Sequence, residues 1–107
     1  MKQYFKAIDF LADEDRIPRP GTSFVPGEKI LPLEIEFQGI PYSLIVRFQV
    51  VVEMWYEPFP PHGPAKTNDL ASYNIQIMYA STPEEEITCI EDLEQLEQYL
   101  KTQIVLT

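Results

Sequence analysis

The chain has 107 residues, with 17 acidic and eight basic side chains, and its formal net charge is −9 at pH 7. This length suits a single domain, 1–107, and a hydrophobic content of 45% with 12% aromatic residues excludes a wholly disordered chain. The surplus of acids argues against direct binding of nucleic acid or anionic membranes, and it favours encounter with basic proteins.

The first 32 residues contain one ambiguous segment and one stretch that is rich in proline and glycine. Residues 4–11 have a helical spacing of apolar side chains but also a high content of Tyr, Phe and Ile. We favour a strand there, because these residue types are enriched in strands. The stretch 13–32 holds four prolines and two glycines, which predicts a loop without regular structure over most of its length.

Alternating apolar and polar residues predict an antiparallel hairpin in the middle of the chain. Residues 33–37 alternate, and 38–41 contain a glycine and a proline that supply a short reversal. In 42–57 every second residue from Leu44 to Tyr56 is apolar, which predicts a strand with one buried and one solvated face. Because strands usually have about 3–10 residues, we expect a bulge, strong coiling or a break in this one.

Trp55 lies on the predicted solvated face of this strand, between Glu53 and Glu57. Large aromatic side chains supply much of the binding energy at protein interfaces, so Trp55 is a candidate apolar anchor for a partner. The alternative is that the N-terminal segment or the 13–32 loop covers it.

A second stretch, 58–72, contains four prolines and is predicted to be a stiff, extended loop. It holds the single histidine, His62. No acid or thiol near His62 in the sequence has the spacing of a catalytic or metal site, so we interpret it as an ordinary loop residue.

The last third of the chain predicts one further strand and one helix. Residues 73–79 alternate, with two tyrosines and two isoleucines on one side, which predicts a strand of the same sheet. Thr88 stands three residues before Glu91 and has the spacing of a capping box, so we expect the helix to begin there. Thr82, followed by a proline, offers a rival start.

The predicted helix has one apolar stripe that faces the sheet. The stripe recurs at helical spacing and consists of Leu93, Leu96, Leu100 and Ile104. Glu97 stands four residues before Lys101, and this order favours an ion pair on the helix surface.

The segment 84–97 is the most acidic part of the chain. Seven of its fourteen residues are acids, and no lysine or arginine interrupts them. The predicted binding residues of this segment are Glu84, Glu85, Glu86, Glu91 and Glu94. Their spacing does not match a calcium or magnesium site, so we predict neither a metal nor a cofactor.

The charge is polarised along the chain. Residues 1–47 carry seven acids and six bases, a net charge of −1, whereas 48–107 carry ten acids and two bases, a net charge of −8. This distribution favours a binding role for the acids, and solubility is the alternative interpretation.

These elements predict an α+β fold, an antiparallel sheet of three or four strands with one C-terminal helix packed on one face. The first functional hypothesis is a small acidic interaction or inhibitor protein that binds a basic protein partner, in the manner of immunity proteins or phage-encoded inhibitors. The alternative is an assembly or virion accessory subunit that forms a homo-oligomer through a sheet edge. The third is a small enzyme or ligand-binding domain. Because no catalytic signature is present, we expect no enzyme and no catalytic residues.

The compartment follows from the cysteine content and from the absence of long apolar runs. The sequence has no apolar stretch long enough for a membrane span or for the core of a secretory signal. The single cysteine, Cys89, allows no internal disulfide and no thiolate metal site of its own. We therefore expect a cytoplasmic protein that does not bind membranes.

Overall fold

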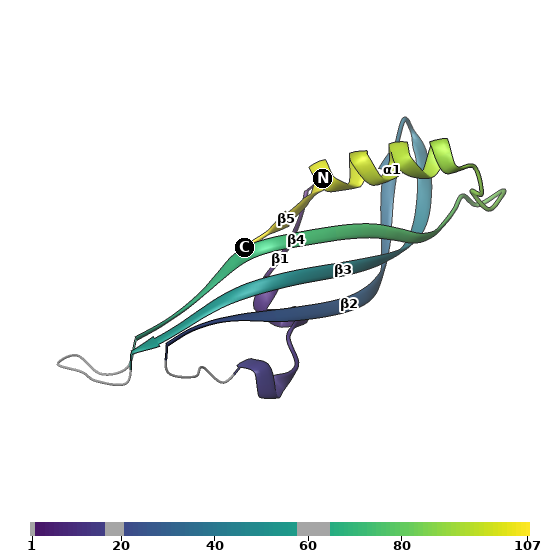
Figure 1. Ribbon diagram of the computed structural model, residues 1–107. Coiled ribbons are helices and arrows are strands. Elements are labelled where there is room, and N and C mark those ends of the chain that lie inside the picture. The colour runs from purple at the N-terminus through teal and green to yellow at the C-terminus, as the bar shows by residue number, and fades with distance from the viewer. Residues whose placement is uncertain (1, 17–20, 58–64) are drawn as a thin grey trace. The chain divides into compact units, whose positions relative to one another are not determined.

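A computed structural model describes residues 2–16, 21–57 and 65–107, with side chains described for all of these except 21–22, 55–57 and 65–68. In chain order the elements are β1 (Gln3–Phe5), two short 3-10 helices η1 (Ala7–Phe10) and η2 (Asp13–Arg16), β2 (Gly21–Phe37), β3 (Ile40–Glu57), β4 (Ala65–Ser81), α1 (Ile90–Gln103) and β5 (Ile104–Leu106), as Figure 1 shows. Three strands form an antiparallel sheet in the order β2–β3–β4, and β1 pairs with β5. Because α1 packs against the three-stranded sheet, the predicted α+β fold is confirmed.

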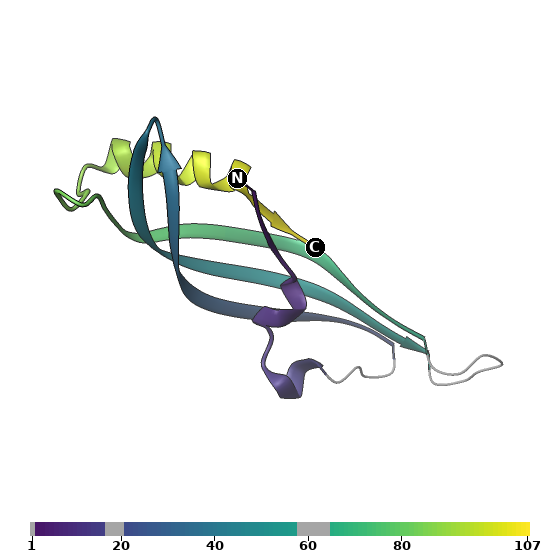
Figure 2. The ribbon, with the colours of Figure 1, turned by 180° about the vertical axis from the view of Figure 1, so that it is seen from behind.

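The central strand β3 has the alternation that the sequence predicts. Its six inward side chains from Leu44 to Met54 are each at most 2% exposed, while the side chains between them are exposed or half-buried. The sequence allows a bulge, strong coiling or a break, and the continuous alternation from Leu44 to Met54 shows that neither a bulge nor a break interrupts this part of β3. Strong coiling accommodates the length instead, and Figure 2 shows β2 and β3 curling up beside α1.

The predicted reversal between β2 and β3 is a two-residue turn. Gln38 and Gly39 both have positive φ angles, 53° and 77°. Turns of this kind match the right-handed twist of the strands they join. The turn brings Phe37 and Ile40 opposite each other and confirms the predicted hairpin.

The first predicted loop is largely a strand, so the prediction of irregular structure over 13–32 is wrong from Gly21 onward. Before that, 13–16 form η2. The prolines are compatible with a strand because β2 lies at an edge of the sheet. Proline has no backbone N–H to donate. Pro26 and Pro32 are six residues apart, so the positions where this group is lacking are on the same side of the strand, the side that has no partner strand.

The prediction of an extended loop over 58–72 is also wrong from Ala65 onward. β4 begins at Ala65, so 65–72 belong to the sheet. Positions 58–64, including His62, lie outside the described residues. In 4–11 the strand prediction is right only for residues 4–5, which end β1, and it is wrong for Ala7–Phe10, which form the 3-10 helix η1.

The chain divides into two compact units, and each unit contains parts of all three long strands. Unit 1 comprises Met1–Tyr4, Lys29–Phe48 and Ile75–Val105, and unit 2 comprises Phe5–Glu28, Gln49–Asn74 and Leu106–Thr107. Unit 1 has nine acids and four bases, a net −5, and unit 2 has eight acids and four bases, a net −4. The charge polarisation along the chain therefore does not separate the two units.

The core of unit 1 lies between α1 and the inward faces of β3 and β4. Leu96 and Leu100 of the predicted apolar stripe are buried, and Leu93 is half-buried. Ile104 is buried too, but it begins β5 just after the helix. The buried residues of β3 and β4 in this unit are Leu44, Val46, Phe48, Ile75 and Ala80. Tyr73 and Tyr79, which the sequence predicts to share a face with Ile75, are 49% and 42% exposed, so they are not buried with it.

Unit 2 is held together by a close approach between η1 and β2. A Cβ atom on Gly27 would lie 2.7 Å from the carbonyl oxygen of Phe10 and 2.8 Å from a methyl carbon of Leu11. Two backbone hydrogen bonds hold Thr107 in this unit. The N–H of Ala7 donates to the carbonyl of Thr107 (2.9 Å), and the N–H of Thr107 donates to the carbonyl of Phe5 (3.1 Å).

Candidate functional site

The loop before α1 is ordered by the hydroxyl group of Thr82. This oxygen accepts hydrogen bonds from the backbone N–H groups of Glu84 (3.2 Å) and Glu85 (3.1 Å). The N–H of Thr82 donates to the carbonyl of Glu85 (2.8 Å), and Ile87 N–H donates to the carbonyl of Ala80 (2.9 Å). These bonds close a tight turn, which we call the Thr82 turn, and so fix the backbone that carries two of the predicted binding glutamates.

The helix start differs in detail from the predicted one. α1 begins at Ile90, and its N-cap residue Cys89 makes no side-chain capping hydrogen bond. The capping box predicted at Thr88 is therefore wrong, because Thr88 precedes the N-cap position by one residue. Thr82 was the rival start, and its hydroxyl instead caps a turn of the preceding loop.

A cavity of about 430 Å³ opens in unit 1 between the β2–β3 hairpin, the Thr82 turn and the first turns of α1. We call it the acidic groove. Its lining residues are Phe37, Gln38, Gly39, Ile40, Pro41 and Tyr42 of the hairpin, Thr82, Pro83, Glu84, Glu85 and Ile87 of the loop, and Asp92, Gln95 and Leu96 of the helix.

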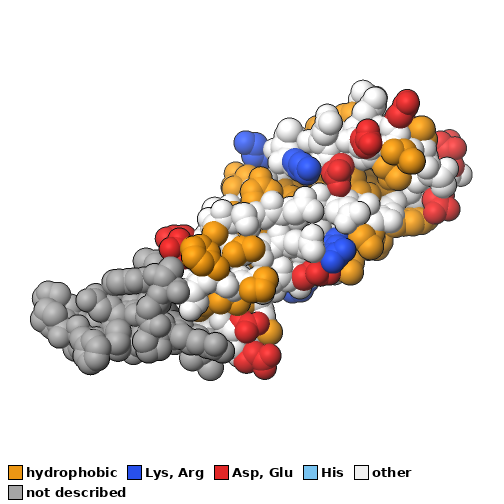
Figure 3. Space-filling view, in the orientation of Figure 1, with side chains coloured by type: hydrophobic (Ala, Val, Ile, Leu, Met, Phe, Trp, Pro, Cys, Tyr) orange, Lys and Arg blue, Asp and Glu red, His pale blue; other side chains and the backbone are white. Residues whose placement is uncertain are grey.

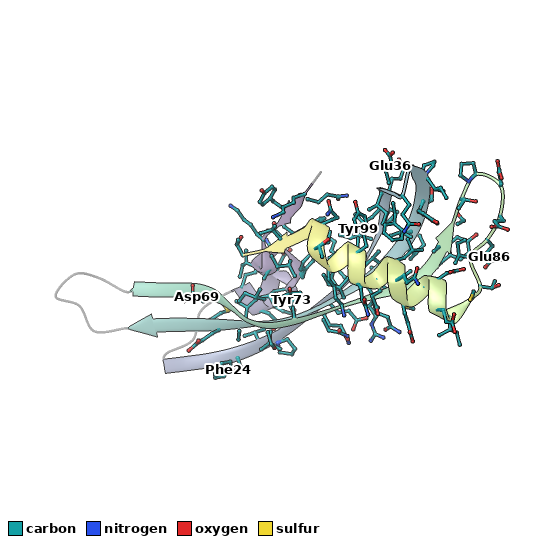
Figure 4. The ribbon with its side chains drawn as sticks, turned by 90° about the horizontal axis from the view of Figure 1, so that it is seen from above. Phe24, Glu36, Asp69, Tyr73, Glu86 and Tyr99 are labelled. Atoms are coloured by element: carbon teal, nitrogen blue, oxygen red, sulfur yellow. The ribbon has the colours of Figure 1, made fainter. Side chains whose placement is uncertain are left out.

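The more buried residues that line the acidic groove are mostly apolar, whereas its carboxylates are exposed. Leu96 is buried, and Phe37, Tyr42 and Ile87 are half-buried. The ring of Phe37 packs against that of Tyr99, with 4.6 Å between the centroids, and Figure 4 shows Tyr99 on the side of α1 that faces the hairpin. The carboxylates that line the groove, by contrast, all belong to exposed residues: Glu84, Glu85 and Asp92.

The structure separates the five predicted binding glutamates into two groups. Glu84 and Glu85 line the acidic groove, whereas the exposed side chains of Glu86, Glu91 and Glu94 are not part of its lining. All five are exposed and lie in the loop before α1 or in its first two turns, and Figure 3 shows acidic side chains in this part of the surface. The groove is therefore one part of a broader acidic surface.

Asp92 lines the groove but was not among the predicted binding residues. A signal for it exists in the sequence: Asp92, Gln95, Leu96 and Tyr99 recur at i, i+3, i+4 and i+7, which places them on one side of the helix. The pattern alone does not say that this side faces the hairpin.

The carboxylates of the groove are not neutralised locally. Within the described residues, no lysine or arginine lies within the 4.0 Å of an ion pair with Glu84, Glu85 or Asp92. Arg16, by contrast, lies 3.9 Å from a carboxylate oxygen of Asp9 in unit 2. The groove therefore presents a concentrated negative potential to an approaching cation.

The described residues contain no metal-binding arrangement of side chains. Across 2–16, 21–57 and 65–107, no group of three His, Cys, Asp or Glu side chains is arranged to hold a metal ion. Cys89 is exposed and has a free thiol. No helix of these ranges has the length and apolar character needed to cross a membrane.

Trp55 and the five predicted binding glutamates belong to different units of the chain. Trp55 lies near the end of β3, and its side chain is outside the described ones. It belongs to unit 2, whereas all five glutamates belong to unit 1. A role for Trp55 as an apolar anchor stays a prediction.

Comparison of the chain with protein-family models, with curated proteins and with solved structures found no match. The geometry of the acidic groove is therefore the basis for a functional proposal.

Proposed function

We propose that this protein is a small binding module that captures a basic partner protein, and that the acidic groove of unit 1 is the contact. The observation that supports this is the combination of half-buried or buried apolar side chains with three exposed carboxylates, none of which forms an ion pair with another described residue. A lysine or arginine side chain has the complementary build, a hydrocarbon stem that ends in a cation.

The separation of apolar and charged lining assigns them different roles in binding. Exposed carboxylates act over a distance and speed the encounter with a cationic surface. Burial of an aliphatic stem against Leu96, Phe37 and Tyr42 would slow dissociation, because apolar contacts persist at salt concentrations that screen exposed charges. Binding of this kind would cover a basic surface of the partner. An inhibitor of a basic protein would act in this way.

Assembly through a sheet edge was the alternative hypothesis, and two features of the edges disfavour it. Pro26 and Pro32 interrupt the donors along the free side of β2. On β4, the backbone N–H of Ile77 donates to the carboxylate of Glu97 at 3.3 Å, so this donor is occupied. We therefore propose partner binding rather than edge-mediated assembly.

The experiment compares two triple charge reversals that change the net charge equally. The groove variant carries Glu84→Lys, Glu85→Lys and Asp92→Lys, and the control carries Glu86→Lys, Glu91→Lys and Glu94→Lys. Each variant replaces one acid of the first helical turn, Asp92 or Glu91, so the loss of helix-dipole stabilisation is matched.

The partner is first obtained by co-purification with the tagged protein from its native host and identified by mass spectrometry. Association is then measured at low and at moderate ionic strength. We expect the groove variant to bind at least about tenfold more weakly than the control variant, since its charges lie at the contact, while the control slows association only through the long-range field. Equal binding by both variants would refute the groove as the contact. Unchanged binding by both at every ionic strength would mean that the acids serve solubility.

A further inference from the structure

We infer that the side chain seated in the acidic groove is an arginine of the partner, an inference that rests on the proposed function. Lysine and arginine both satisfy the charge of the groove. The aromatic rings and the number of hydrogen-bond acceptors distinguish them.

Two aromatic side chains, Phe37 and Tyr42, line the groove from neighbouring strands of the hairpin. The Phe37 ring is held by Tyr99 of α1, at an interplanar angle of 35°, so its orientation is set before a ligand arrives. A planar guanidinium group stacks on aromatic faces and is more weakly hydrated than an ammonium group, so it loses less on entering such a site.

The acceptors of the groove are numerous and come from three segments. Carboxylates come from Glu84 and Glu85 on the Thr82 turn and from Asp92 on α1, and side-chain amides come from Gln38 of the hairpin and Gln95 of α1. A guanidinium group has five N–H donors in a fixed plane, and an ammonium group has three. A guanidinium can therefore reach acceptors on opposite sides of the groove at the same time.

The hairpin turn lines the groove and has open space beside Gly39. A Cβ atom added to Gly39 would meet nothing within 4 Å. A partner's main chain can therefore pass over the turn while one side chain enters the groove. This arrangement suits a single long side chain that projects from a partner surface.

The test uses three blocked pentapeptides that are identical except for the central residue of a Gly-Gly-Xaa-Gly-Gly sequence: arginine, lysine or citrulline. Citrulline has nearly the shape of arginine without its charge. Each peptide is titrated into the full-length ¹⁵N-labelled protein, and the side-chain amide resonances of Gln38 and Gln95 report on the groove. We expect the arginine peptide to bind at least about threefold more tightly than the lysine peptide, and the citrulline peptide to bind more weakly than both.

Two tyrosine variants assign the preference to the groove. Tyr42→Leu should remove most of the advantage of arginine over lysine, whereas Tyr79→Leu should preserve it, because Tyr79 is exposed in the same unit but does not line the groove. Equal affinities for arginine and lysine would overturn the inference and leave the proposed function intact. Failure of all three peptides to shift the two glutamine resonances would also overturn it, and the matched charge reversals would then decide the proposed function separately. Equal binding of citrulline would refute both, because charge would then play no part.

Discussion

Removal of the Thr82 hydroxyl tests how the acidic groove is built. In Thr82→Ala, the backbone N–H groups of Glu84 and Glu85 lose their acceptor, which lies 3.2 Å and 3.1 Å away in the structure. A hydrogen bond contributes about 0.5–1.5 kcal/mol to stability, but water can replace it in an exposed turn. We therefore expect Thr82→Ala to lower the free energy of unfolding by about 1 kcal/mol, which corresponds to about 4 °C in Tm.

The matched controls are Thr82→Ser and Thr88→Ala. Serine keeps the hydroxyl group and should remain within about 0.5 kcal/mol of the unsubstituted protein. Thr88→Ala should also stay within about 0.5 kcal/mol, because Thr88 is not the N-cap of α1. Urea melts followed by circular dichroism give the three values. A larger loss for Thr88→Ala than for Thr82→Ala would show that Thr88 caps the helix, and the described loop would be wrong.

Three further substitutions test the packing of the sheet and of η1 against β2. Phe48→Ala should lower the free energy of unfolding by about 3–5 kcal/mol because Phe48 is fully buried. Gln49→Ala, on the opposite face of β3, should lower it by less than about 0.5 kcal/mol. Equal losses for the two variants in denaturant melts would contradict a core on one face only. Gly27→Ala should lower the free energy of unfolding by about 1–3 kcal/mol. The new methyl group would lie 2.7 Å from the carbonyl oxygen of Phe10, which is a backbone atom and cannot rotate away as the end of a side chain can. A neutral or stabilising effect of Gly27→Ala, measured by thermal melts, would contradict the close approach between η1 and β2.

The sequence predicts the fold where one face of an element must be buried. The alternation from Leu44 to Met54 and the helical stripe at Leu96 and Leu100 both follow from this requirement, and both are confirmed. The extent of β2 could not be predicted in the same way. Pro26 is compatible with a strand when the strand is at an edge, and the position of a strand in its sheet is a property of the whole fold.

The candidate site could be predicted in part. The run of acids indicates Glu84 and Glu85, because charge is visible in the sequence without a structure. Phe37 and Tyr42 could not be recognised as partners of these acids, since their approach depends on how far the hairpin curls toward α1. Glu97 is a similar case. Its spacing predicts an ion pair with Lys101, but its carboxylate accepts a hydrogen bond from the backbone N–H of Ile77 on β4 instead.

The contact between Glu97 and Ile77 has a consequence for the behaviour of the protein at high concentration. Chains with long strands are prone to stack strand on strand into cross-β fibrils, and the unpaired N–H groups of edge strands are where such stacking begins. A carboxylate from α1 occupies one of these groups on β4, and it adds a negative charge that would repel an incoming chain. Pro26 and Pro32 lie on β2, the opposite edge strand, so each edge of the sheet has a feature that opposes the addition of a further strand, and loss of α1 would remove the one on β4.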